Sequence, residues 1–182
     1  MTKFRISKIT KGLLVAGSVL LVYGYLCRFL DLYFFWESKY LGWLILLIGG
    51  GGAAIIDWIK YNTRIGKKTI GQKVMFGVLT FAFLIQVILL IVLPNTNAYE
   101  ASKTFLRQNR YIETHLGDIE GISIIPIGSI SVSQSGDIET GEAVLHLIVK
   151  GSKQYRDITL YLLKMADTEW QVMQADGIKG MY

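Results

Sequence analysis

The chain has 182 residues, of which 52% are hydrophobic and 18% are charged, a composition typical of membrane proteins. Residues 1–94 carry 11 Lys and Arg against 3 Asp and Glu, a net charge of +8, whereas residues 95–182 carry 8 against 11, a net charge of −3. The basic charge therefore belongs to the apolar half. The negative half argues against nucleic-acid binding, which depends on neutralising phosphates.

Three apolar stretches predict three transmembrane helices, at about residues 12–36, 40–59 and 74–93. Each is close to the ~20 residues that a helix needs to cross about 30 Å of hydrocarbon. Pro94 ends the third stretch, because proline cannot continue a helix. The alternative for the first stretch is a cleaved signal peptide. Tyr25 and Leu26, just before Cys27, are not the small residues of a cleavage site, so we expect an uncleaved span.

The distribution of Lys and Arg predicts the orientation of these spans. The N-terminal tail has four basic residues and the 60–73 loop has five, with no acidic residue in either, whereas the 37–39 loop has one Lys and one Glu. Basic loops stay on the cytoplasmic side. We therefore expect a multi-pass protein of a bacterial-type inner membrane, with a membrane domain (1–94), a cytoplasmic N-terminus and an extracytoplasmic C-terminal domain (95–182).

Two features within the predicted spans are candidate sites. Arg28 and Asp31, three residues apart near the outer end of the first span, read as a mutually paired couple that reaches the membrane interface. The alternative is contact with a polar group of a partner protein. In the second span, Gly49 with Ala53 and Gly50 with Ala54 have the spacing that lets helices approach closely. Whether they pack within the chain or against another protein stays open.

The C-terminal half predicts a small α+β domain. Asn97 and Glu100 resemble a capping box that starts a helix, a break is expected near residues 108–110, and Gly117 is expected to stop the helix. After Gly117 the apolar period changes to two, with strands expected around 122–135, 143–149, 158–163 and 170–172. Together these predict a helix, possibly broken, that packs on a four-stranded antiparallel sheet.

The stretch from Ala98 to about residue 176 resembles the outer domain of the cytochrome c oxidase assembly protein 1 family, whose fold is shared with the accessory subunit of the mitochondrial presequence translocase. The residues that carry the resemblance are apolar positions and turn glycines: Ala101, Phe105, Leu106, Asn109, Ile112, Leu116, Gly117, Gly141, Ala143, the run 149–153, Trp170 and Val172. The chain departs from the family at Arg110, where members often have proline, and in having three predicted spans instead of one.

No set of residues in the sequence has the spacing of a catalytic centre, a metal site or a phosphate-binding loop. His115 and His146 lack a second ligand at metal spacing, and the serines at 129–135 alternate with apolar residues as on the wet face of a strand. We therefore expect a non-enzymatic accessory or assembly factor without a cofactor or small-molecule substrate. Its expected partners are the bilayer and another integral membrane protein. The resemblance implies cytochrome oxidase assembly; the alternative is a protein translocase or secretion complex.

Overall fold

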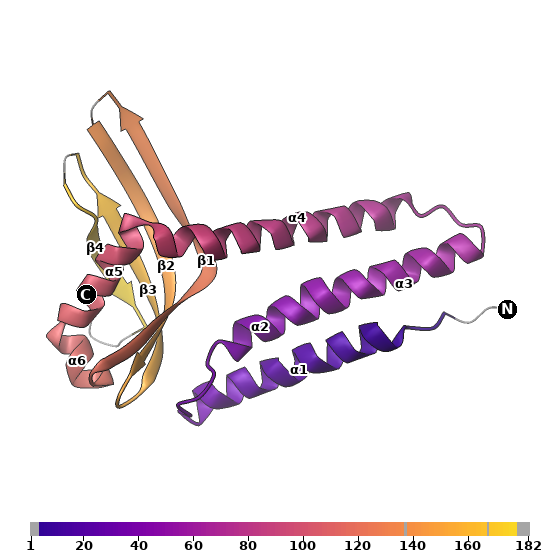
Figure 1. The fold of residues 1–182 in the computed structure, drawn as a ribbon, viewed down its shortest axis with the longest axis horizontal. Coiled ribbons are helices and arrows are strands. Elements are labelled where there is room, and N and C mark those ends of the chain that lie inside the picture. Colours follow the sequence, from indigo (N-terminus) through magenta and orange to yellow (C-terminus); the bar gives the residue numbers. More distant parts are fainter. Residues whose placement is uncertain (1–3, 137, 167, 178–182) are drawn as a thin grey trace. The chain divides into compact units, whose positions relative to one another are not determined.

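The computed structural model describes residues 4–136, 138–166 and 168–177 (Figure 1). The chain forms two compact units, and the boundary between them falls inside α4, between Ile85 and Gln86. The first unit is helical. The second combines two short helices with an antiparallel sheet.

The first unit consists of helices that follow one another with short connections. α1 (Lys8–Phe29) is followed by α2 (Ser38–Leu44), a π-helical segment η1 (Ile45–Gly50), α3 (Gly51–Arg64) and α4 (Ile70–Val92). Because α2, η1 and α3 are continuous, the described residues contain three helical stretches that are long and apolar enough to span a membrane: Lys8–Phe29, Ser38–Arg64 and Ile70–Asn95. The predicted number of apolar helices is confirmed.

The first helix ends at Phe29, so the predicted extension to residue 36 is wrong. Asp31 and Phe35 both have a positive φ, of 48° and 43°, which a helix does not allow. The apolar and aromatic residues from Leu32 to Trp36 belong instead to the connection before α2. The span was predicted too long because apolar composition alone does not reveal that the backbone leaves the helix after Phe29.

Glycines allow α1 to lie directly against the helix that follows it. A Cβ added at Gly24 would clash with the Lys39 backbone nitrogen, and one at Gly42 would come within 2.6 Å of the Leu21 nitrogen. A Cβ at Gly17 would come within 2.8 Å of the Leu46 nitrogen. Contacts this short leave no room for any side chain, as in small-residue packing of membrane helices.

The second unit begins within the last turns of α4. Leu93 is 2% exposed and belongs to the core of this unit, and Leu89 packs against the same core. The 3₁₀ turn η2 (Leu93–Asn95) holds Pro94, so the α-helix stops just before the proline, as predicted. The division at residues 94 and 95 stays a prediction of where the chain leaves the membrane.

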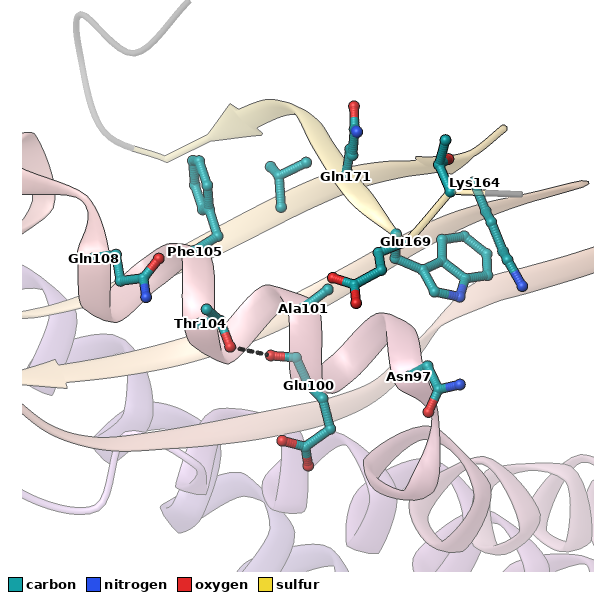
Figure 2. A pocket seen from close by; sticks show the side chains of 12 residues that line it. Asn97, Glu100, Ala101, Thr104, Phe105, Gln108, Lys164, Glu169 and Gln171 are labelled. Carbon is teal, nitrogen blue, oxygen red and sulfur yellow. Dashed lines mark hydrogen bonds between the residues drawn. The ribbon is translucent and has the colours of Figure 1, made fainter. Parts of the chain in front are cut away.

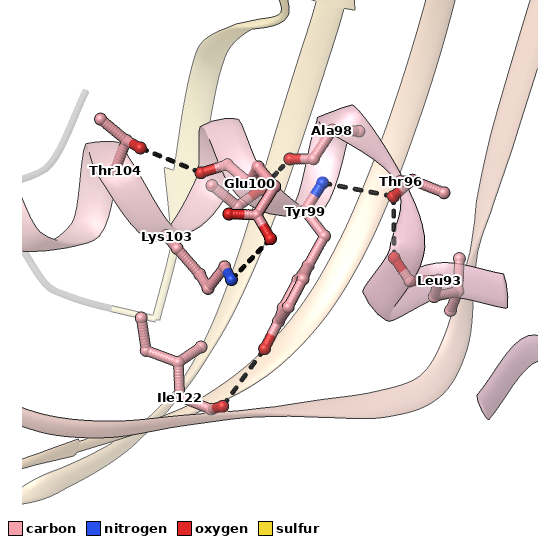
Figure 3. Close-up of polar contacts among 9 residues, drawn as sticks. Leu93, Thr96, Ala98, Tyr99, Glu100, Lys103, Thr104 and Ile122 are labelled. Atoms are coloured by element: carbon pink, nitrogen blue, oxygen red, sulfur yellow. Dashed lines mark hydrogen bonds and ion pairs between the residues drawn. The ribbon is translucent and has the colours of Figure 1, made fainter. Parts of the chain in front are cut away.

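Thr96, not Asn97, caps the first helix of the second unit, α5 (Asn97–Gln108). The Thr96 hydroxyl accepts from the Tyr99 backbone N–H at 3.3 Å and donates to the Leu93 carbonyl at 2.8 Å (Figure 3). The predicted cap at Asn97 is wrong by one residue. Thr96 has the extended backbone of a cap, at φ −98° and ψ 148°, whereas Asn97 is already helical.

The predicted break near residues 108–110 is confirmed. Asn109 adopts φ −83° and ψ 107°, and its side chain accepts from the backbone N–H groups of Tyr111 and Ile112 at 3.0 and 3.3 Å. It therefore caps α6 (Arg110–Leu116), and the chain breaks without the proline that the family often has. Gly117, at φ 77°, ends α6 as expected.

The sheet is a four-stranded antiparallel meander in the order β1-β2-β3-β4. Its strands are β1 (Ile119–Ser135), β2 (Ile138–Gly151), β3 (Tyr155–Lys164) and β4 (Gln171–Asp176). The predicted helix-plus-sheet fold is confirmed. The strand expected around 122–135 is β1, whose pairing with β2 is irregular between Ile124 and Gly128.

One face of the sheet packs against α5 and α6 (Figure 1). Alternate residues of the two central strands point into this core, which is the burial pattern of a half-covered sheet. The core comprises Ala98, Leu106, Ile112 and Leu116 from the helices, with Leu145, Leu147, Val149, Ile158, Leu160 and Leu162 from the sheet.

The corrected cap can be tested by exchanging neighbouring residues. Thr96→Ala removes the hydroxyl that caps α5, and loss of such a cap costs ~1 kcal/mol. We expect the amides of the first turn of α5 to exchange hydrogen about five-fold faster, measured by mass spectrometry on the full chain in detergent. Asn97→Ala, the matched control, should leave these rates unchanged, and faster exchange in the control alone would contradict the assignment.

Candidate binding site

A groove lies between α5 and the start of β4 (Figure 2). It has a volume of about 640 Å³, which is within the range of ligand-binding pockets. Its walls come from Asn97, Glu100, Ala101, Thr104, Phe105 and Gln108 on α5, and from Lys164, Thr168, Glu169, Trp170, Gln171 and Val172.

The floor of the groove is apolar and continuous with the core. Ala101 and Phe105 on α5, and Trp170 and Val172 at β4, are partly buried and pack against the core cluster. The Trp170 ring also lies over Gly141, where an added Cβ would come within 2.7 Å of the ring. Trp170 is thus held at the edge of the core and is partly exposed. An aromatic side chain fixed in this way is a typical anchor of an interface.

The rim of the groove is polar and leans towards negative charge. Lys164 is engaged by Glu139, with 2.6 Å between Nζ and Oε2. Glu100 pairs with Lys103 on the same helix at 2.7 Å and is 64% exposed. Glu169, labelled in Figure 2, is exposed and lines the groove. An apolar floor with a polar rim that carries two acidic residues and one lysine favours a ligand that brings apolar side chains and polar or basic groups.

Tyr99 fixes the first turn of α5, and so sets the position of one wall of the groove. Its hydroxyl donates to the Ile122 carbonyl of β1 at 3.3 Å, and the residue is 8% exposed (Figure 3). Burial raises the pKa of the phenol above its usual value of 10.0. The hydroxyl therefore keeps its proton at neutral pH and remains a donor to β1.

Arg28 links the end of α1 to the connection that follows it. Its Nη1 donates to the Gly24 and Trp36 carbonyls, both at 3.0 Å, and the guanidinium carbon lies 4.8 Å from the centre of the Trp36 ring. Asp31 is exposed and lies beyond the end of α1. Arg28 and Asp31 therefore do not lie on one helix, although both were predicted within the first span. Their mutual pairing stays a prediction, and the contacts of Arg28 give it a structural role.

The small-residue run of the second span faces two neighbours. Gly50 lies against Leu14 of α1, where an added Cβ would come within 2.6 Å of Cδ2. Gly49 lies near Leu13, at 3.7 Å in the same measure. Ala53 lines a shallow apolar cleft of about 280 Å³ between α3 and α4. Gly49 and Gly50 thus lie beside α1 of their own chain, and Gly49 also lines the cleft together with Ala53. Packing of this run against another protein stays a prediction.

Sequence reasoning missed two arrangements in particular. One is the Asp57 carboxylate of α3, which accepts from the Ser7 backbone N–H at 2.8 Å and from the Thr10 hydroxyl at 2.7 Å. The other is the close approach at Gly17 and Gly24. The spacing of seven residues between Thr10, Gly17 and Gly24, all buried, is the signal that would have indicated this face of α1.

In the described part of the chain, no group of three or more His, Cys, Asp and Glu side chains is arranged to hold a metal ion. Comparisons of the chain with protein-family models, with curated proteins and with solved structures each gave no match. The resemblance to the oxidase assembly family is therefore limited to apolar positions and turn glycines between residues 98 and 176.

Proposed function

We propose that this chain is a membrane-anchored accessory factor that binds another integral membrane protein through the groove between α5 and β4. It acts by binding, without catalysis and without a cofactor. The observation that carries the proposal is the groove itself, in which a partly exposed Trp170 and Phe105 lie within an acidic rim.

The position of the groove in the sequence supports a membrane partner. α5 begins at Asn97, two residues after the end of the third candidate span at Asn95. A helix of 12 residues is about 18 Å long. The groove wall therefore starts within a short length of chain from the membrane, where the extramembrane segments of other membrane proteins are concentrated.

The specific version of the proposal is assembly of cytochrome oxidase, which the resemblance of residues 98–176 implies. The alternative is an accessory role in a protein translocase or secretion complex, since the same fold resemblance includes a translocase subunit. Both versions need a protein-binding surface and no chemistry. They differ in which proteins occupy the groove.

We also propose that the chain lies in a bacterial-type inner membrane with its N-terminus and the 60–73 loop in the cytoplasm. The support is the excess of Lys and Arg in both segments. The second unit is then extracytoplasmic, which puts the groove on the outer side.

The orientation is tested with cysteines in a Cys27→Ser background. Ser133→Cys places a thiol on the second unit, and Lys68→Cys places one in the loop before α4; both positions are exposed. We expect a membrane-impermeant maleimide to label position 133 in intact spheroplasts, and position 68 only after permeabilisation. The reverse pattern would contradict the proposed orientation.

Groove binding is tested by a matched pair of threonines. Thr104 lines the groove and Thr114 does not, and each is exposed and donates to the carbonyl four residues earlier on its helix. We expect Thr104→Arg to reduce recovery of partner proteins at least ten-fold, because a bulky cation fills the groove, whereas Thr114→Arg should not. A ten-fold loss corresponds to about 1.4 kcal/mol.

The measurement is affinity purification of the full chain in mild detergent with quantitative mass spectrometry. Oxidase subunits among the lost proteins, with reduced oxidase activity in a deletion strain, would support the specific version. Normal oxidase activity with translocase components recovered would favour the alternative. Unchanged recovery with Thr104→Arg would contradict binding at the groove.

A further inference from the structure

The free edge of β1 differs between its two halves. β1 is an end strand of the sheet, so one of its edges has no neighbouring strand in the described part of the chain. In the first half, the Ile122 carbonyl accepts from Tyr99, and the register is interrupted between Ile124 and Gly128, with Pro126 inside the interruption. Bulges, proline and covering side chains are the usual devices that protect an edge strand from pairing.

The second half, Gly128–Ser135, has none of these devices. Its register with β2 is unbroken, from Gly128 opposite Leu145 to Ser135 opposite Ile138. The stretch contains no proline and no charged residue. Residues 131–136 are exposed, with Val132 at 51%, and the tip extends beyond β3, whose pairing with β2 starts at Gly141. A long, regular and uncharged edge of this kind is suited to pairing with another strand.

The side chains of Gly128–Ser135 are complementary to those of a second copy of the same strand. Ser129, Ser131 and Ser133 share one face of the sheet, and Ile130 and Val132 share the other. If two copies run antiparallel about Ser131, each Ile130 lies opposite a Val132 and each Ser129 opposite a Ser133. β-branched pairs and hydroxyl pairs are both favourable cross-strand combinations.

We propose that Gly128–Ser135 pairs with the same strand of a second copy of this chain, antiparallel and centred on Ser131. The two four-stranded sheets then form one continuous eight-stranded sheet around a twofold axis, with the same surface on both subunits.

Electrostatic repulsion between the acidic residues near this edge is too weak to prevent pairing of two copies. Glu142 of β2 lies opposite Ser131, so it is the acidic residue nearest to the centre of the register. In the paired sheet the two Glu142 residues would be three strand spacings apart, about 14 Å at ~4.8 Å per strand. This exceeds the Debye length of about 8 Å at physiological salt, so their repulsion is screened.

The contact between the two paired strands is small, so we expect it to form only where the two copies are concentrated. A pair of strands this short buries less than the ~1,200 Å² of a typical stable complex in solution. Anchoring both copies in one membrane raises their effective concentration and compensates for the small area. The pairing is therefore expected in membranes and is expected to be lost on dilution in detergent.

The register is tested by disulfide cross-linking in membranes, in a Cys27→Ser background. Residues directly opposite each other have Cβ atoms about 4.5–5.5 Å apart, near the span of a disulfide. We expect Ser131→Cys to give a covalent dimer under mild oxidation at least five-fold more efficiently than Ser129→Cys or Ser133→Cys alone. Co-expression of the 129 and 133 variants should restore cross-linking, because those positions face each other across the axis.

Two further variants separate pairing from general proximity. Val132→Lys, added to Ser131→Cys, puts a charge on the edge and should abolish the dimer, whereas Val132→Thr keeps the β-branch and should preserve it. Equal cross-linking at 129, 131 and 133, or none at 131, would overturn the proposal. A product of Ser131→Cys with a different protein would also overturn it. The cross-linking pattern at 129, 131 and 133 does not involve the residues that line the groove, so the proposed function can fail or survive independently of it.

Discussion

The packing of α5 and α6 against one face of the sheet is the interaction on which the second unit depends. A four-stranded sheet needs one face covered, and these two helices supply Ala98, Leu106, Ile112 and Leu116 to the core. Because α5 also leaves a groove beside the short strand β4, the packing that stabilises the unit creates its candidate binding site. Thr96 and Tyr99 fix where α5 begins, and Asn109 fixes where it ends.

The same packing divides the edges of the sheet into different surfaces. At β4, the nearby helix makes a groove with an apolar floor and an acidic rim. In the first half of β1, the Tyr99 hydroxyl binds the Ile122 carbonyl, and the pairing with β2 is irregular between Ile124 and Gly128. The second half of β1 keeps a regular register with β2, and its residues 131–136 are exposed. The proposed partner protein and the proposed second copy would therefore use different residues of this unit.

The sequence predicted the order of elements well, because periodicity changes at Gly117 from a helical period to a period of two. It located the helix break, because Asn109 interrupts an apolar face with a residue suited to capping. It placed the first cap one residue late, since Thr96 and Asn97 are both good capping residues and only the backbone distinguishes them. It extended the first span too far, because the residues from Leu32 to Trp36 are apolar even though they form a connection.

Two features could not be predicted from the sequence: the groove of the second unit and the helix contacts of the first unit. Residues 97–108 and 164–172 become neighbours only through the meander of the sheet, and neither segment alone has a motif. In the first unit, the sequence predicted close packing at the glycine run 49–52, whereas the backbones approach most closely at Gly17, Gly24 and Gly42. Isolated glycines in apolar helices are common, so spacing alone does not identify the ones in contact.

The most direct test of the central claim is site-specific photo-crosslinking in living cells. A photoreactive amino acid at Thr104 reports what occupies the groove, and the same amino acid at Thr114 reports the background on a neighbouring helix. The account predicts a discrete cross-link from position 104 to another integral membrane protein, absent at position 114. Position 104 giving no protein adduct, or the same adducts as position 114, would contradict it.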